Sequence, residues 1–124
     1  MYRILMLVLG AVGVVWGITA LFVPEVLAQL YGGELDSFAR SFANVGAAIA
    51  VGFGLMDWSV RNLQDTATRR WVLVSNLTAV TLVATVLLLS TASGTFNSLG
   101  WIGAAAHAAL AAVVLVALIQ SKGG

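Results

Sequence analysis

Four apolar runs, each about long enough to cross a lipid bilayer, dominate this sequence. They cover approximately residues 4–23, 38–55, 71–89 and 99–119, and polar residues separate them. A transmembrane helix needs roughly 20 apolar residues. A helix satisfies its own backbone hydrogen bonds, for which lipid offers no partners, and four strands cannot close a β-barrel. We therefore expect an all-α fold, a four-helix transmembrane bundle that forms a single integral membrane domain over residues 1–124.

The scarcity of charge supports this expectation. Only 9% of the 124 residues are charged and 60% are hydrophobic, whereas soluble domains carry roughly 25% charged residues. The net charge of +1 gives no reason to expect nucleic acid as a partner. The chain has no cysteine, which excludes thiolate metal ligands and thiol redox chemistry, and its ligands are too few for a structural metal site. The lipid bilayer is the first partner that the composition predicts.

The charges that are present predict an orientation. An even number of spans places the N-terminus, the second connection and the C-terminus on one side of the membrane. The basic residues of these three segments are Arg3, Arg61, Arg69, Arg70 and Lys122. The first connection carries the acidic residues Glu25, Glu34 and Asp36. Because basic residues near span ends favour the cytoplasm, we expect an N-in and C-in arrangement with an acidic outer loop.

Two boundaries between helix and connection can also be read from the sequence. Pro24 is expected to close the first span, because a proline ring cannot continue a helix comfortably. Near the start of the third span, Asp65, Thr66 and Thr68 are candidate N-caps.

Small residues at helical spacing predict where the helices approach each other closely. Gly13 and Gly17 form a G-x-x-x-G pair in the first span. The second span offers Ala43, Ala47, Ala50 and Gly54, and the fourth offers Gly100, Ala104, Ala108 and Ala112. Membrane helices associate through close packing, so small residues concentrate at their contacts. Such faces are expected to pack within one bundle, and one of them is available for another protein chain.

A polar stripe in the second span is the main candidate for a site. Arg40 lies just inside the outer boundary of the span, and Asn44 follows one helical turn deeper. His107 in the fourth span, Thr85 in the third and Trp16 in the first fall at similar depth. Polar groups in a span usually face the bundle interior or a water-filled cavity. We therefore expect these side chains to converge in the outer half of the bilayer.

Two main interpretations of this polar group remain open, beside proton transfer through His107 or a channel. In the structural one, Arg40 pairs with Asp36 or extends outward, while Asn44, His107 and Thr85 bond one another and fix the bundle. In the functional one, the same residues form an outer-leaflet pocket for a small lipid or quinone. Arg40 would then receive the polar head of the ligand, and His107 with Asn44 would hydrogen-bond it.

The sequence contains no recognisable catalytic machinery. There is no phosphate-binding loop, serine triad or acid/base carboxylate pair, and the one histidine is too few for haem held by two histidines. These observations favour a non-catalytic accessory or scaffold subunit of a larger membrane complex, in contact with other subunits or with further copies of itself. They favour no cofactor; the alternative is a protein that binds, or acts on, a lipid or quinone.

A family resemblance covers nearly the whole chain. Its motifs are LFVPEVLAQLYG at the end of the first span, FARSFANVGAAIAVGFGL in the second, the RRW of the basic connection, and GWIGAAAHAAL in the fourth. The chain resembles the DoxX-like and related small bacterial four-helix membrane proteins. The resemblance implies a multi-pass protein of the bacterial inner membrane, and some members of that group are similar to subunits or companions of membrane oxidoreductases. It assigns no catalytic residue.

Overall fold

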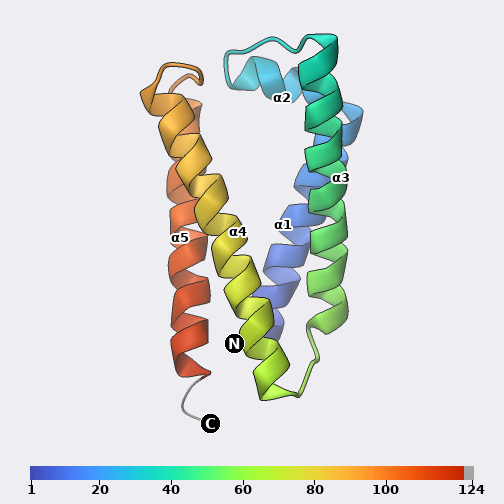
Figure 1. The fold of residues 1–124 in the computed structure, drawn as a ribbon, viewed down its shortest axis with the longest axis vertical. Helices are drawn as coiled ribbons and strands as arrows, with labels where there is room; N and C mark the ends of the chain where they lie inside the picture. The colour runs from blue at the N-terminus through green and yellow to red at the C-terminus, as the bar shows by residue number, and fades with distance from the viewer. Residues whose placement is uncertain (122–124) are drawn as a thin grey trace. The chain divides into compact units, whose positions relative to one another are not determined.

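The computed structural model describes residues 1–121, which form five helices with short connections and contain no strand. The helices, in chain order, are α1 (Tyr2–Phe22), α2 (Pro24–Leu30), α3 (Ser37–Val60), α4 (Thr66–Ala92) and α5 (Leu99–Gln120), as Figure 1 shows. Four of them, α1, α3, α4 and α5, are long and apolar enough to cross a membrane. The all-α fold class with four candidate spans is therefore confirmed.

Two of the long helices begin at an aspartate N-cap, before their apolar runs start. The Asp36 carboxylate accepts a hydrogen bond from the Ala39 amide at 2.7 Å and caps α3. Asp65 caps α4 by accepting from the Thr68 amide at 2.6 Å, and it also accepts from the Thr68 hydroxyl. The Thr68 hydroxyl first, and then the Thr68 amide, hold the pKa of the Asp65 carboxyl below its usual range, because both favour the ionised form. Of the three candidate caps, Asp65 is the one that the chain uses.

Helix α2 was not expected from the sequence. The expectation that Pro24 closes the first span is confirmed, because α1 ends at Phe22, and Val23 departs from helical geometry with φ −135° and ψ 51°. The same proline then begins α2, since the residue before a proline avoids the α region and a proline is favoured in the first turn of a helix. Gly32 follows α2 with a positive φ of 82°, a conformation that glycine adopts without strain.

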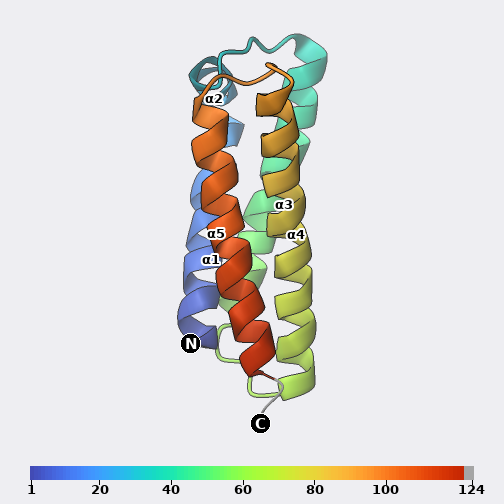
Figure 2. The ribbon, with the colours of Figure 1, turned by 90° about the vertical axis from the view of Figure 1, so that its left-hand side faces the viewer.

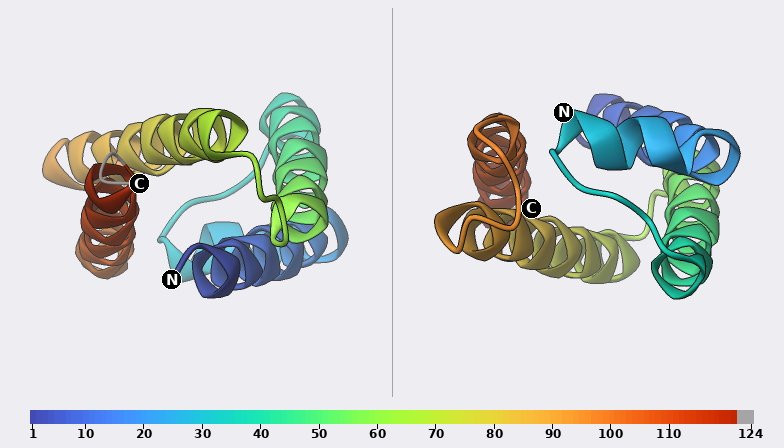
Figure 3. Two further views of the ribbon diagram at one scale, coloured as in Figure 1. Left: turned by 90° about the horizontal axis from the view of Figure 1, so that it is seen from below. Right: turned by 90° about the horizontal axis from the view of Figure 1, so that it is seen from above.

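The chain divides into two compact units, Met1–Asn62 and Leu63–Gly124. The first unit contains α1, α2 and α3, and α1 lies against α3 (Figures 1 and 3). The second unit contains α4 and α5, which pack on each other as the two arms of a hairpin (Figure 2). The single domain expected from the sequence stays a prediction.

Glycine allows α1 and α3 to meet backbone to backbone. A Cβ atom added at Gly17 would lie 2.6 Å from the Ala47 carbonyl oxygen and 2.9 Å from the Val51 nitrogen. A Cβ atom at Gly13 would lie 3.0 Å from the Ala50 carbonyl oxygen. Real Cβ atoms are essentially never found at the first of these distances, so a side chain at position 17 would push the two helices apart.

The contact is reciprocal further along the same two helices. A Cβ atom at Gly54 of α3 would lie 2.6 Å from the Gly10 carbonyl oxygen, and one at Gly10 would lie 2.8 Å from the Gly54 carbonyl oxygen. Gly10 therefore faces Gly54 while Gly17 faces Ala47, which is the register of two antiparallel helices. At these positions the backbones of α1 and α3 are in direct contact.

The second hairpin is closed at its loop end by a different contact. Gly100, at the start of α5, lies against the side chains of Thr91 and Phe96, and an added Cβ atom would overlap the Thr91 hydroxyl. Thr91 is buried, and its hydroxyl donates to the Leu87 carbonyl oxygen at 2.7 Å. Ala104, one turn after Gly100, is also buried. Gly100 is thus needed where the two helices leave the connecting turn.

These contacts generate a prediction for single substitutions to alanine. Gly17→Ala should destabilise the protein by about 1–3 kcal/mol, the usual cost of forcing a methyl group into a packed contact. Gly52→Ala is the matched control, because nothing lies within 4 Å of a Cβ atom added at Gly52 of α3. The measurement is the detergent-induced unfolding midpoint of both variants in mixed micelles.

The control should unfold at the wild-type midpoint or slightly above it, since alanine is a better helix former than glycine. Equal midpoints for the Gly17 and Gly52 variants would contradict the backbone contact of α1 with α3.

Candidate functional site

Arg40 is held by an ion pair that the sequence did not indicate. Its guanidinium pairs with the carboxylate of Glu25 on α2, and the two side chains are 53% and 41% exposed. The sequence analysis offered Asp36 as the partner, but the Asp36 carboxylate caps α3. Arg40 lies in the first turns of α3, so its pair with Glu25 ties the short helix α2 to the start of the second span.

Asn44 lies one turn deeper on α3 than Arg40. Its side-chain oxygen Oδ1 is enclosed, and it accepts no hydrogen bond from the described residues. The neighbouring hydroxyl of Ser41 is satisfied by its own helix, because it donates to the Ser37 carbonyl oxygen at 3.0 Å. A buried polar atom without a partner costs free energy, so a donor placed beside the Asn44 oxygen would stabilise it.

Trp16 occupies the remaining candidate position of the first unit. Its side chain is 50% exposed on α1, next to Gly17, whose own face is occupied by α3. Within the first unit the structure therefore joins Arg40 to Glu25 and leaves Trp16 and Asn44 at other positions of the hairpin.

His107 is bonded within its own helix. Its Nδ1 atom lies 2.9 Å from the Gly103 carbonyl oxygen, one turn earlier in α5. Because the carbonyl can only accept, Nδ1 carries the hydrogen of this bond, and in the neutral ring Nε2 is then left as an acceptor. The convergence of His107 with Arg40 and Asn44 stays a prediction, since they belong to different units of the chain.

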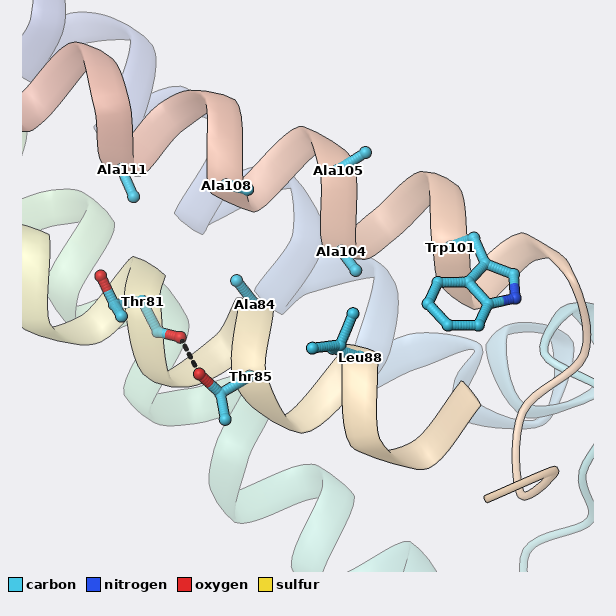
Figure 4. Close-up of a pocket in the computed structure, with 9 residues that line it drawn as sticks. All are labelled: Thr81, Ala84, Thr85, Leu88, Trp101, Ala104, Ala105, Ala108 and Ala111. Atoms are coloured by element: carbon cyan, nitrogen blue, oxygen red, sulfur yellow. Dashed lines mark hydrogen bonds between the residues drawn. The ribbon is translucent and has the colours of Figure 1, made fainter. Parts of the chain in front are cut away.

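An open groove of about 430 Å³ lies along α4 and α5, inside the second unit. Small apolar side chains make up most of its wall, and Figure 4 shows Trp101 at one end of the row. The lining residues are Thr81, Ala84, Thr85, Leu88, Trp101, Ala104, Ala105, Ala108 and Ala111. Three of the residues singled out in the sequence, Thr85, Ala104 and Ala108, therefore border one surface, and His107 is not among the residues that line it.

The groove offers little hydrogen bonding to a ligand. The Thr85 hydroxyl donates to the Thr81 carbonyl oxygen at 2.9 Å, along its own helix (Figure 4). The wall has one other hydroxyl, that of Thr81. Its remaining side chains are alanines, a leucine and the indole of Trp101. Such a surface fits an apolar occupant, either a lipid chain or a helix from another protein.

The sequence analysis missed Glu25 and Thr81. Glu25 directly follows Pro24, and a proline followed by an acidic residue is a common helix start, so the pattern was available in the sequence. What the sequence could not supply was the position of α2 beside α3. Thr81 was not singled out, because nothing in its spacing distinguishes it from the other threonines of the third span.

The described residues contain no group of three histidine, cysteine, aspartate or glutamate side chains that could hold a metal ion. No protein-family model, curated protein or solved structure matches this chain. The four apolar helices indicate a multi-pass membrane protein.

Proposed function

We propose that this chain is a non-catalytic accessory or scaffold subunit of a larger membrane complex, and that this membrane is the bacterial inner membrane that the DoxX-like resemblance implies. The observation that carries the proposal is the alanine-lined groove of α4 and α5. A subunit of this kind contributes a surface to its partner, and the groove is a surface of suitable size and chemistry in the second unit.

Helices in lipid associate differently from helices in water. Lipid tails are as apolar as leucine, so association depends on close packing, and small side chains permit it. Gly17 and Gly54 serve this purpose inside the first hairpin, where backbone atoms of the facing helix already occupy the space beside them. Ala84, Ala105 and Ala108 instead border open volume. A transmembrane helix of a partner subunit would supply the missing contacts.

A second candidate function is favoured by the same groove. Its volume of about 430 Å³ and its apolar wall would also accept the chain of a small lipid or quinone, with Trp101 at one end. Because the wall has few polar groups, it is better suited to binding such a molecule than to catalysing a reaction of it. The two candidates differ in the occupant, and one experiment separates them.

The experiment is purification of the tagged protein from its native membranes in mild detergent. We expect partner subunits in a fixed ratio with the wild-type protein, and their loss with Ala108→Leu, which fills the groove. Ala106→Leu is the control, because Ala106 is exposed on α5 and does not line the groove.

Partners retained by the Ala108 variant would exclude the groove as the docking surface. A protein that purifies alone, with one lipid or quinone that the same variant loses, would establish the second candidate instead of the first.

We also propose the N-in and C-in orientation. The antiparallel register of α1 and α3 supports it, because it places Arg3 and Arg61 at one end of the first hairpin and the acidic Glu25 and Glu34 toward the other. In the second hairpin, Arg69 and Arg70 stand at the start of α4, away from the uncharged turn that joins it to α5. Basic residues favour the cytoplasmic side.

Cysteine labelling tests this orientation without background, since the chain has no cysteine. A single cysteine in place of Ser98 or Gly33 should react with a membrane-impermeant reagent in the periplasm. A cysteine in place of Asn62 should react only after the membrane has been opened. Labelling of the Asn62 variant in intact spheroplasts would reverse the orientation.

A further inference from the structure

Two neighbouring arginines at the start of α4 have different surroundings. Arg69 is half-buried and folds back on the preceding connection, where its guanidinium donates to the Leu63 carbonyl oxygen and, at 3.3 Å, to the Gln64 side chain. Arg70 is exposed and has no hydrogen-bond or ion-pair partner among the described residues. The first arginine stabilises the turn before α4, while the guanidinium of the second is available to a partner outside the chain.

The position of Arg70 makes an external anion favourable. The start of a helix carries a partial positive charge, so a cation there is unfavourable unless an anion offsets it. The nearest carboxylate along the chain, Asp65, is committed to the cap of α4 through its bonds with Thr68. No acidic residue lies in the first turn of α4. The charge of Arg70 is therefore left without compensation inside the hairpin.

The residues around Arg70 form a graded surface. Ala67, Arg70, Trp71 and Val74 recur at three- and four-residue spacing and so share one face of α4. The Trp71 side chain is 72% exposed and that of Val74 is 37% exposed. Along the helix the surface thus changes from a cation to an indole and then to an aliphatic group, at the point where α4 enters its apolar span.

We propose that this face of α4 binds an anionic phospholipid. Arg70 takes the phosphate, because a guanidinium donates two parallel hydrogen bonds to phosphate oxygens. The indole of Trp71 lies at the level of the interface, where tryptophan is enriched in membrane proteins. Val74 contacts the start of an acyl chain. The order of the three groups along α4 matches the order of headgroup, interface and tail in a lipid leaflet.

The test measures the lipids around Trp71 in the full-length protein. Trp16, Trp58 and Trp101 are replaced by phenylalanine, so that Trp71 is the fluorophore, and the protein is reconstituted in bilayers with brominated lipids that quench it on contact. Brominated phosphatidylglycerol should compete for this position roughly five-fold better than brominated phosphatidylcholine, since one basic residue at an anionic surface contributes about that factor. Arg70→Gln should abolish the preference, and Arg70→Lys should retain part of it.

Arg69→Gln is the matched control, because it removes the same charge from the adjacent position. The preference should persist in that variant once circular dichroism shows unchanged helix content. Equal quenching by the two lipids, or a preference that survives Arg70→Gln, would overturn the proposal. So would an equal loss in both variants, which would indicate a general charge effect. Loss of the preference on addition of inorganic phosphate would show a site for free anions instead of a lipid site.

Discussion

The close approach of α1 and α3 is the contact on which the first half of the molecule depends. Lipid gives two apolar helices no hydrophobic reason to associate, so their contact must come from packing. Glycine at positions 10, 13 and 17 of α1, and at position 54 of α3, lets backbone meet backbone. The antiparallel register that results brings the two helix ends near the first connection together, and there α2 reaches α3 through the ion pair of Glu25 with Arg40.

Small residues have a second use in the other hairpin. Gly100 is required where α5 leaves the turn, because the Thr91 side chain occupies the space of a Cβ atom. Further along α5, alanines line an open, apolar groove between α4 and α5. The proposed accessory role rests on this groove, where a partner helix could pack closely against small side chains.

Much of the architecture could be predicted from the sequence. Hydropathy located the four long helices, because the length of a span is fixed by the thickness of the bilayer. The helix α2 was missed because Pro24 was taken only as the end of α1, although a proline also fits the first turn of a new helix. The partner of Arg40 could not be predicted either, since Glu25 reaches it through tertiary structure and not through helical spacing along α3.

The candidate site was less predictable than the fold. Depth in the membrane grouped Trp16, Arg40, Asn44, Thr85 and His107, but depth alone does not state which way each side chain points. The Thr85 hydroxyl bonds a carbonyl of its own helix, an option open to a short polar side chain in a span. The His107 ring also bonds a carbonyl of its own helix, and residue spacing does not exclude either bond. The Asn44 oxygen, by contrast, is enclosed without a donor among the described residues.

The contact between α1 and α3 can be measured directly by nuclear magnetic resonance on the full-length protein in bicelles. A hydrogen of Gly17 points toward the Cγ2 methyl group of Val51, which lies 2.7 Å from the position of an added Cβ atom. The account predicts a strong nuclear Overhauser effect between a Gly17 Hα and this Val51 methyl group. It predicts none between residues of α1 and the Gly52 Hα that takes the place of a Cβ atom. Absence of the first effect, with both helices intact, would contradict the account.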